Sequence, residues 1–383
     1  MLWLNFLHFY QPANLEKEKI SEAVVKSYEH ILKMLEANSS LRVTVNFTGG
    51  LLHRLATDLA RQDLIDGYSR LIATGQVEIV GTAAYHALLP LISKREMVAQ
   101  IKEQEQYLKK YFGINRPRGF FLPELAYSAE VAKIVKKLGY EWLIVDEISL
   151  NGTIDGVFGG VCLDENSGLK VVARNRKISE SYVPDTLLKI INDTSGAPNC
   201  IITATDAELY GLRHVDTNGE LENLIAAQNF QTGTLSEYIN EQSDVKSVKL
   251  IDSNWQTTEA DLLAGQKYKL WSEVGNETHN DLWKLAQLAE KLHYKYAQDE
   301  NIWWSRWHLS RGLQSCAWWW ASRHDFREVF GPLAWSPDEV ERGVNELIRS
   351  IRSLEKSTDL KTKIKAEKMA QKIRTQVWLK HWQ

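Results

Sequence analysis

The chain has 383 residues, of which 44% are hydrophobic and 25% are charged, and its net charge of −3 gives no electrostatic reason to bind nucleic acid or an anionic membrane. This length suits one large domain with a smaller one. Cys162, Cys200 and Cys316 are odd in number and widely spaced, so they predict neither a disulfide framework nor a zinc ribbon. The apolar first residues lack a basic stretch and a cleavage signal, so we expect a buried first strand in a cytoplasmic protein.

The first two thirds of the chain alternate between predicted strands and helices. Most candidate strands are short apolar runs without polar alternation, which is typical of parallel strands buried on both faces. The expected strands are Leu2–Leu7, Val43–Phe47, Val77–Val80, Gly119–Leu122, Trp142–Val145, Lys170–Ala173, Cys200–Ala204 and Val248–Ile251. Helices are expected at 93–113, where Ser93 and Glu96 form a capping box, and at 128–138. Such repeated units predict a parallel sheet or barrel, and the number of strands favours a barrel.

The last third of the chain shows only helical patterns. The expected helices are 277–298, 303–322, 337–355 and 358–380. Pro337 directly follows Ser336, which is a typical helix start. We therefore expect a catalytic barrel over residues 1–260 and a helical bundle over 261–383 that packs on it and contributes aromatic residues to the cleft.

Tryptophan is unusually frequent and unevenly distributed. Of 14 tryptophans, Trp3, Trp142 and Trp255 precede residue 260, and the other eleven lie between Trp271 and Trp382. An indole ring packs well between helices, and its face also stacks on sugar rings. Composition alone does not decide between these uses.

Polar and ionisable residues follow the ends of several expected strands. In a parallel barrel the loops after the strands build the site, so these ends carry the reactive groups. The residues at this edge are His8, Gln11, Asn46, His86, Glu124, Asp146, Glu147, Asp206 and Glu208. One carboxylate at a strand end is more often a helix cap or a solvated group, but their recurrence at one edge indicates a site.

Glu124 and Asp206 stand out because each follows a strongly apolar strand that would present its carboxylate at the barrel mouth. Two carboxylates flanking a sugar are the machinery of glycoside hydrolysis. One attacks the anomeric carbon, and the other protonates the leaving oxygen and later deprotonates the incoming water or sugar hydroxyl. In a retaining enzyme the two groups should lie about 5–5.5 Å apart.

Five blocks in chain order resemble the motifs of glycoside hydrolase family 57. They are His8-Phe-Tyr10-Gln11-Pro12, Gly75-Gln-Val-Glu78 continuing to Tyr85-His86, Phe121-Leu-Pro123-Glu124, Asp206-Ala-Glu208-Leu-Tyr-Gly211 with His214, and Ala317-Trp318-Trp319-Trp320. The resemblance implies an α/β fold, an irregular (β/α)7 barrel followed by a C-terminal helical bundle. It also implies retaining chemistry on α-glucans or maltooligosaccharides, without a metal or another cofactor.

The same resemblance implies roles for individual residues. Glu124 would be the nucleophile that forms a glycosyl-enzyme, and Asp206 the acid/base. The residues expected to bind substrate are His8, Gln11, Glu78, His86, Asp146, Glu208, His214 and Trp319.

Three positions depart from the family's pattern. Tyr10 replaces the second histidine of the first block, and Phe121 stands where many members carry tryptophan. Cys316, together with Ser315, occupies a place where some members present an acidic residue. These departures leave the reaction class intact but leave substrate length, and hydrolysis against transfer, open.

Two other classes of protein remain open from sequence. A metal-dependent carbohydrate deacetylase also uses an irregular barrel, but the histidines His86, His214 and His279 lack metal-ligand spacing. A non-catalytic glucan-binding protein would keep the barrel and a tryptophan-lined groove, and the two carboxylates argue against it. Amylase, glucanotransferase, branching and debranching activities are not separable from sequence, and neither is the oligomeric state.

Overall fold

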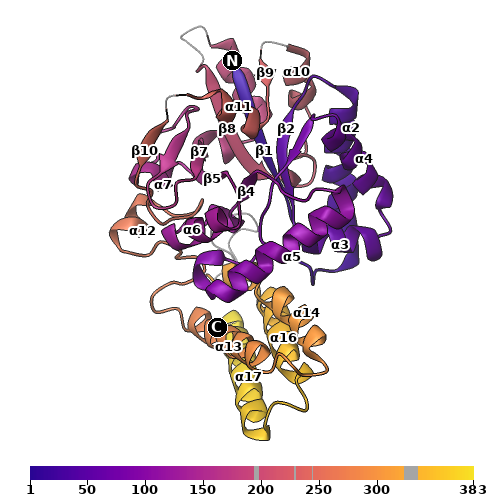
Figure 1. Ribbon diagram of the computed structural model, residues 1–383, viewed down its shortest axis with the longest axis vertical. Helices are drawn as coiled ribbons and strands as arrows, with labels where there is room; N and C mark the ends of the chain where they lie inside the picture. The colour runs from indigo at the N-terminus through magenta and orange to yellow at the C-terminus, as the bar shows by residue number, and fades with distance from the viewer. Residues whose placement is uncertain (194–197, 228–229, 244, 323–334) are drawn as a thin grey trace. The chain divides into compact units, whose positions relative to one another are not determined.

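The computed structural model describes residues 1–193, 198–227, 230–243, 245–322 and 335–383 (Figure 1). It forms two compact units. The first comprises Met1–Gln11, Leu15–Ala83 and Ile101–Trp255, and the second comprises Pro12–Asn14, Ala84–Gln100 and Gln256–Gln383. Two short segments from the N-terminal part therefore belong to the second unit, which a single boundary at residue 260 does not capture. In the described ranges no helix has both the length and the apolar character that crossing a bilayer requires.

The strands of the first unit pair in two five-stranded sheets. The strands are β1 (Leu2–Phe9), β2 (Val43–Phe47), β3 (Val77–Ile79), β4 (Gly119–Phe121), β5 (Trp142–Asp146), β6 (Cys162–Asp164), β7 (Lys170–Arg174), β8 (Cys200–Asp206), β9 (Gln231–Thr232) and β10 (Lys246–Val248). One sheet has the order β3-β2-β1-β8 with β9 beside β1, and the other has the order β10-β6-β7-β5-β4. Among these described pairs only β6 and β7 are antiparallel.

A few backbone hydrogen bonds join the two sheets at two seams. At the first, Gly81 after β3 bridges to Phe120, and its N–H donates to the Gly119 carbonyl at 2.9 Å. At the second, the N–H of Asn175 after β7 donates to the Ile202 carbonyl at 2.8 Å. Strands β1, β2, β3, β4, β5, β7 and β8 thus follow one another in a ring. The predicted α/β class is confirmed, and the ring is consistent with an irregular barrel whose ladder is interrupted at the seams.

Alternation along the strands sorts the interior side chains into layers, because every second residue of a strand faces the same side. From the N-terminal to the C-terminal end, the interior rows of β1 and β8 are Leu4-Phe6-His8 and Ile202-Ala204-Asp206. The first two residues of each row belong to one buried apolar cluster. The third residues, His8 and Asp206, are polar and pair in register. The interior therefore changes from apolar to polar at the C-terminal ends of the strands.

Helices cover the outer faces of these strands. The helices of the first unit include α1 (Lys17–Ala23), η1 (Val24–Tyr28), α2 (Glu29–Ala37), α3 (Gly49–Thr57), α4 (Gln62–Ala73), η3 (Pro123–Leu125), α6 (Ala129–Lys137), α7 (Ile148–Asn151), α8 (Arg176–Ser179), α9 (Val183–Asn192), η4 (Ala207–Leu209), α10 (Glu220–Ala227) and α11 (Leu235–Glu241). Figure 1 shows α2, α3 and α4 beside β1 and β2. The outward residues of those strands share an apolar cluster with these helices.

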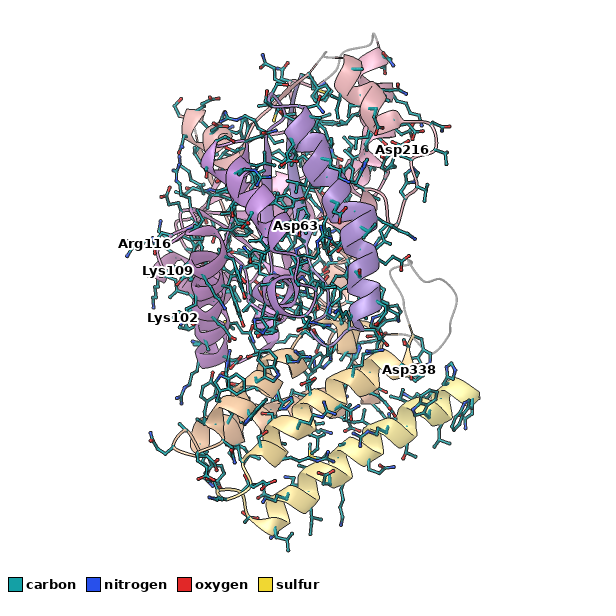
Figure 2. All side chains as sticks on the ribbon, turned by 90° about the vertical axis from the view of Figure 1, so that its right-hand side faces the viewer. Asp63, Lys102, Lys109, Arg116, Asp216 and Asp338 are labelled. Carbon is teal, nitrogen blue, oxygen red and sulfur yellow. The ribbon has the colours of Figure 1, made fainter. Side chains whose placement is uncertain are left out.

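Helix α5 (Lys94–Phe112) contributes residues to both units. Figure 2 shows Lys102 and Lys109 on its outer side and Arg116 just after it, all pointing away from the protein interior. Asp63 of α4 points outward in the same way. These charges form the solvated faces of amphipathic helices.

The second unit consists mainly of helices. They are η2 (Leu89–Leu91), α12 (Glu259–Leu263), α13 (Glu277–Lys295), α14 (Ile302–Gly312), α15 (Cys316–Trp319), α16 (Pro337–Ser353) and α17 (Leu360–Trp382). The predicted single helix over 303–322 is wrong, because α14 ends at Gly312. Gln314 forms a bridge with Ala87, and the Ser315 N–H donates to the His86 carbonyl at 3.0 Å. These bonds occupy backbone groups that a continuous helix would need.

The tryptophans of the second unit divide between core and surface. Trp271 and Trp318 are fully buried. Trp303 and Trp304 on α14 are instead 58% and 51% exposed. Packing between helices therefore accounts for only part of the enrichment.

Candidate functional site

His8 lies at the centre of the polar strand ends in the first unit. It pairs in register with Asn46 on one side and Asp206 on the other. Its Nδ1 is 2.9 Å from Asn46 Oδ1, and its ring stacks on Phe121 with centroids 4.6 Å apart. Burial lowers the pKa of His8, against an opposing effect of Asp206, so the imidazole is neutral at neutral pH.

Glu124 lies on the turn η3, directly after β4. Its φ is +60° and that of Leu125 is +46°. Residues with a side chain rarely adopt this left-handed region, and such strain costs on the order of 1–3 kcal/mol and clusters at functional sites. Trp255 holds the turn twice: its Nε1 donates to Glu124 Oε2 at 2.8 Å, and its backbone N–H donates to the Glu124 carbonyl at 3.2 Å. The turn presents the carboxylate at the strand end, and Trp255 fixes one oxygen.

Asp206 is the last residue of β8 and forms an ion pair with Arg213 through Oδ2. The side chains of Asp206 and Arg213 are 22% and 44% exposed. A pair this exposed contributes little to stability, of the order of 1 kcal/mol or less. Asp206 is therefore open to solvent at the same edge where its neighbour His8 is buried.

Glu208 is buried two residues after Asp206. Its Oε1 accepts a hydrogen bond from Gln11 Nε2 at 2.8 Å and another from the Tyr28 hydroxyl. Burial raises the pKa of Glu208 to about 7, and the negative charge of Asp206 acts in the same direction. The structure thus brings the predicted residues Gln11 and Glu208 together.

Asp146 is fully buried, and its carboxylate is bonded to two arginines. Arg174 Nε lies 2.7 Å from its Oδ2, and Arg176 Nε lies 3.0 Å from its Oδ1. Arg174 also lies over the ring of Trp255 at 5.2 Å from the centroid. Asp146 is thus placed to hold Arg174 against Trp255, which in turn holds Glu124. That Asp146 also binds substrate stays a prediction.

Glu78 lies one interior layer below the strand ends. It pairs in register with Thr44, and Thr44 pairs with Phe6, two residues before His8. Its Oε2 accepts hydrogen bonds from Thr44 Oγ1 at 2.9 Å and from the Ser236 N–H at 3.1 Å. The register thus places Glu78 one layer below His8, and its expected role in substrate binding stays a prediction.

His214 contacts a separate set of residues. Its ring stacks on Tyr182 with centroids 3.8 Å apart, and its carbonyl accepts from the Gly211 N–H at 3.1 Å. These contacts stabilise the loop after η4.

His86 and Trp319 belong to the second unit. His86 has a φ of +59°, and its Nδ1 lies 3.0 Å from Ser315 Oγ. The loop before it is held by Gln100, whose Oε1 accepts from the Tyr85 N–H at 3.1 Å. Trp319 lies on α15 and contacts Trp320 edge-on at 4.7 Å. His86 and Glu124 thus share a left-handed φ, which is strained for a residue with a side chain.

The sequence of the chain was compared with models of known protein families. Residues 3–253 match the family model described as "Glycosyl hydrolase family 57". The chain belongs to this family. In the described part of this family 57 member, no group of three or more His, Cys, Asp or Glu side chains is arranged to hold a metal ion.

Relatives of this family 57 chain include named enzymes. It is 30% identical over 147 residues to the 4-alpha-glucanotransferase of Thermococcus litoralis, covering 38% of this chain and 22% of that enzyme. It is 31% identical over 147 residues to the alpha-amylase of Pyrococcus furiosus, again covering 38% of this chain and 22% of the relative. The matched stretch thus spans about a fifth of either relative's length.

Two solved enzyme structures have a similar fold. The crystal structure of the Thermococcus litoralis 4-alpha-glucanotransferase superposes with a TM-score of 0.72 at 20% identity, covering 92% of this chain and 60% of that one. The alpha-amylase AmyC from Thermotoga maritima gives a TM-score of 0.70 at 16% identity, covering 96% of both chains. At such low identity the similarity concerns the fold.

Three residues of this family 57 site were not predicted from the sequence to be functional. Arg213 lies seven residues after Asp206, so position alone could have suggested it. Trp255 gave a weaker signal, as an isolated tryptophan before the helical region. Tyr28 gave none, because a tyrosine within a helical stretch is usually a core residue.

Proposed function

We propose that this family 57 member is a retaining enzyme that hydrolyses or transfers α-linked glucans, with Glu124 as nucleophile and Asp206 as acid/base. The observation that carries the proposal is the strained turn after β4, which holds Glu124 at the strand end with one oxygen bonded to Trp255. Asp206 ends β8 in the polar layer of the same unit. The named activities of the relatives support a glucan as the substrate.

The proposed reaction has two displacements. First, a carboxylate oxygen of Glu124 bonds to the anomeric carbon as the bond to the glycosidic oxygen breaks, and Asp206 gives that oxygen its proton. Then the Asp206 carboxylate takes a proton from water or from a sugar hydroxyl, whose oxygen displaces Glu124. Water as acceptor gives hydrolysis, and a sugar gives transfer.

Neighbouring side chains serve this reaction by binding and by positioning. Neutral His8, with Gln11 and Glu208 beside Asp206, is proposed to bind the sugar that is transferred. Asp146 positions the nucleophile through Arg174 and Trp255. His86, His214 and Trp319 stay proposed substrate contacts.

The proposal is tested with Glu124→Gln and Asp206→Asn on maltoheptaose and amylose. Removing the nucleophile should lower kcat by more than about a thousandfold, because the covalent step is lost. Asp206→Asn should lower it by about 10²–10⁴-fold. Glu222→Gln on the exposed side of α10 is the matched control and should keep the wild-type rate.

Product analysis separates the competing functions. Products with the substrate's anomeric configuration support retention, longer chains indicate transfer, new branch points indicate branching, and short reducing sugars alone indicate hydrolysis. If Glu124→Gln keeps both the rate and the configuration, Glu124 is not the nucleophile. Glucan binding without turnover by the wild type would favour a non-catalytic binding protein. Loss of activity on chelation would favour a metal-dependent deacetylase.

A further inference from the structure

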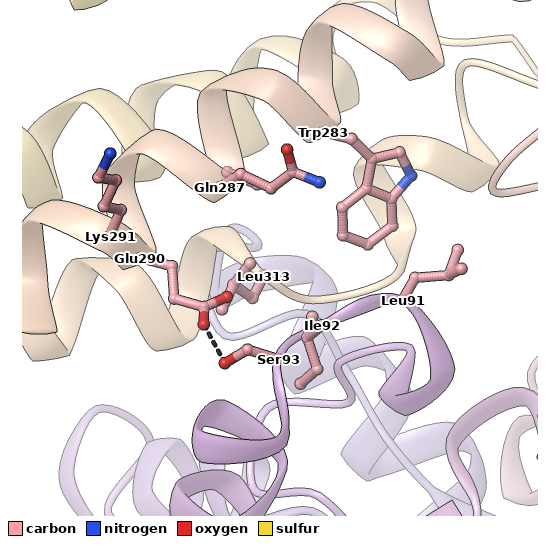
Figure 3. A pocket seen from close by; sticks show the side chains of 9 residues that line it. Leu91, Ile92, Ser93, Trp283, Gln287, Glu290, Lys291 and Leu313 are labelled. Atoms are coloured by element: carbon pink, nitrogen blue, oxygen red, sulfur yellow. Dashed lines mark hydrogen bonds between the residues drawn. The ribbon is translucent and has the colours of Figure 1, made fainter. Parts of the chain in front are cut away.

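One face of α13 combines a tryptophan with a row of polar side chains. Gln287 follows Trp283 by four residues, and Glu290 and Lys291 follow Gln287 by three and four, which places them on one side of the helix. With the segment around Ser93 they line a pocket of about 360 Å³ within the second unit (Figure 3). A volume of this size lies at the lower end of the roughly 300–1,000 Å³ typical of small-ligand sites. None of its lining residues belongs to the proposed reaction site.

The Trp283 ring is fixed by the core of the unit. It stacks on Trp318 with centroids 4.2 Å apart and planes 27° apart, and its Nε1 donates to the Trp271 carbonyl at 2.9 Å. Figure 3 shows the ring directed from α13 toward the segment that carries Leu91 and Ile92. A ring that is already immobilised loses little conformational entropy when a ligand stacks on it.

The polar side chains of the pocket offer hydrogen bonds to hydroxyl groups. Gln287 supplies a donor and an acceptor, and Lys291 supplies donors. In the described ranges neither side chain is bonded to another residue. Glu290 accepts a hydrogen bond from the Ser93 hydroxyl, drawn as a dashed line in Figure 3, and this bond orients its carboxylate.

The chemistry of the lining selects a neutral ligand with one apolar face. The charges of Glu290 and Lys291 cancel, so neither an anion nor a cation is favoured. Leu91, Ile92 and Leu313 add an apolar surface beside the indole. A glucosyl unit has this combination, because its ring presents C–H groups on one face and hydroxyl groups around the rim.

We propose that this pocket is an anchoring site for glucosyl units of a long α-glucan chain. The choice of glucan rests on the proposed function. The pocket would raise the affinity for long chains by adding a second point of attachment, as linked binding sites do. Short maltooligosaccharides that reach only the reaction site would gain nothing from it.

The test fills the pocket from its solvent side. Gln287→Phe places a bulky ring at an exposed helical position, and Lys291→Ala removes the ammonium donors. The control, Lys284→Phe, puts the same ring one turn earlier on α13, where the side chain is 64% exposed and does not line the pocket. Each is combined with Glu124→Gln and run in native gels with glycogen, and each is also assayed alone on glycogen and maltotriose.

We expect Gln287→Phe to weaken retention by glycogen about tenfold, Lys291→Ala to weaken it less, and Lys284→Phe to leave it unchanged. The ratio of the KM for glycogen to the KM for maltotriose should rise about tenfold in Gln287→Phe. Unchanged retention in a folded variant, checked by its Tm, overturns the anchoring site, and so does an equal loss on both substrates.

The two proposals fail in different ways. If Gln287→Phe keeps the retention by glycogen and Glu124→Gln abolishes turnover, only the anchoring site is contradicted. If the wild type shows no turnover but Gln287→Phe weakens retention by glycogen, the anchoring site is supported and the catalytic proposal is wrong.

Discussion

The position of Glu124 depends on a chain of contacts that begins at Asp146. Asp146 binds Arg174, the Arg174 guanidinium lies over Trp255, and the Trp255 indole donates to Glu124. The left-handed φ of Glu124 needs such support, because an unsupported glutamate would relax to a commoner conformation. Trp255 therefore positions Glu124, the proposed nucleophile.

Replacing Trp255 with phenylalanine should test this positioning role. The variant keeps an aromatic ring but loses the N–H donor to Glu124, and a hydrogen bond to a charged group contributes about 1.5–3 kcal/mol. We expect kcat to fall roughly ten- to a hundredfold with little change in KM for maltoheptaose. Trp303→Phe on the surface of α14 is the control. A change in KM alone would instead assign Trp255 to substrate binding.

Glu208 should make stability depend on pH. Its pKa is raised from 4.5 to about 7 by burial, so between these values the native protein holds a proton that the unfolded chain releases. The free energy of unfolding should therefore fall as the pH rises from about 4.5 to 7. Glu208→Gln should flatten this part of a plot of Tm against pH. A variant with the wild-type slope would show that other groups cause it.

Strand-end position was enough to find His8, Gln11, Asp206 and Glu208 as neighbours. It could not show that two arginines converge on the carboxylate of Asp146, because they lie at the end of a different strand and just after it. Glu78 came from the family resemblance, and the sequence does not show its depth in the sheet, because register depends on pairing with a strand more than thirty residues away.

The contacts at the seams between the two sheets restrict which residues fit there. At the first seam, a Cβ on Gly81 would lie 2.4 Å from the Tyr140 hydroxyl, so only glycine fits between β3 and β4. Tyr140 is itself buried and bonded to Glu105, which leaves it little room to move.

Gly81→Ala should therefore destabilise the protein by about 1–3 kcal/mol through overpacking. Gly233→Ala is a matched control, because its Cβ would meet Leu4 at an ordinary 3.4 Å. That change should be neutral or stabilise by up to about 1 kcal/mol. Urea unfolding of both variants measures the difference, and equal stabilities would contradict a tight seam.

Buried apolar runs made most strands predictable from sequence, since β2 matches its expected bounds and β1, β5, β7 and β8 extend slightly further. Strands β6 and β9 were missed because they are short and only partly buried. The break between α14 and α15 was missed for another reason. It is imposed by bonds to Ala87 and His86, over two hundred positions away.

At the scale of the whole molecule, the second unit contains its own buried charge cluster. Glu96 is fully buried and accepts from Arg306 Nη1 at 2.7 Å, from the Tyr294 hydroxyl at 2.6 Å and from Gln100 Nε2 at 3.1 Å. These bonds join the first turns of α5 to α13 and α14. The segment that carries His86 is thereby attached to the helices of its own unit.

Glu96→Gln should loosen the second unit selectively. Breaking a buried ion pair costs about 3 kcal/mol, because Arg306 loses its counter-charge. Amide hydrogen exchange should rise in residues 84–100 and 277–312, while peptides from β1 and β8 serve as the internal control. Arg306→Met added to Glu96→Gln should recover part of the protection. An equal rise in both units would show that they unfold together.

The position of β1 between β2 and β8 has a consequence for folding during synthesis. Its partner β8 lies far along the chain, so that Trp3 and Thr203, which share a hydrogen bond, are 200 positions apart. Until β8 leaves the ribosome, one edge of an apolar strand has no partner and is open to pairing with other chains. Asp206 emerges only with β8 itself, and Trp255 emerges later still, so a nascent chain carries the hazard of aggregation long before it holds the residues proposed for catalysis.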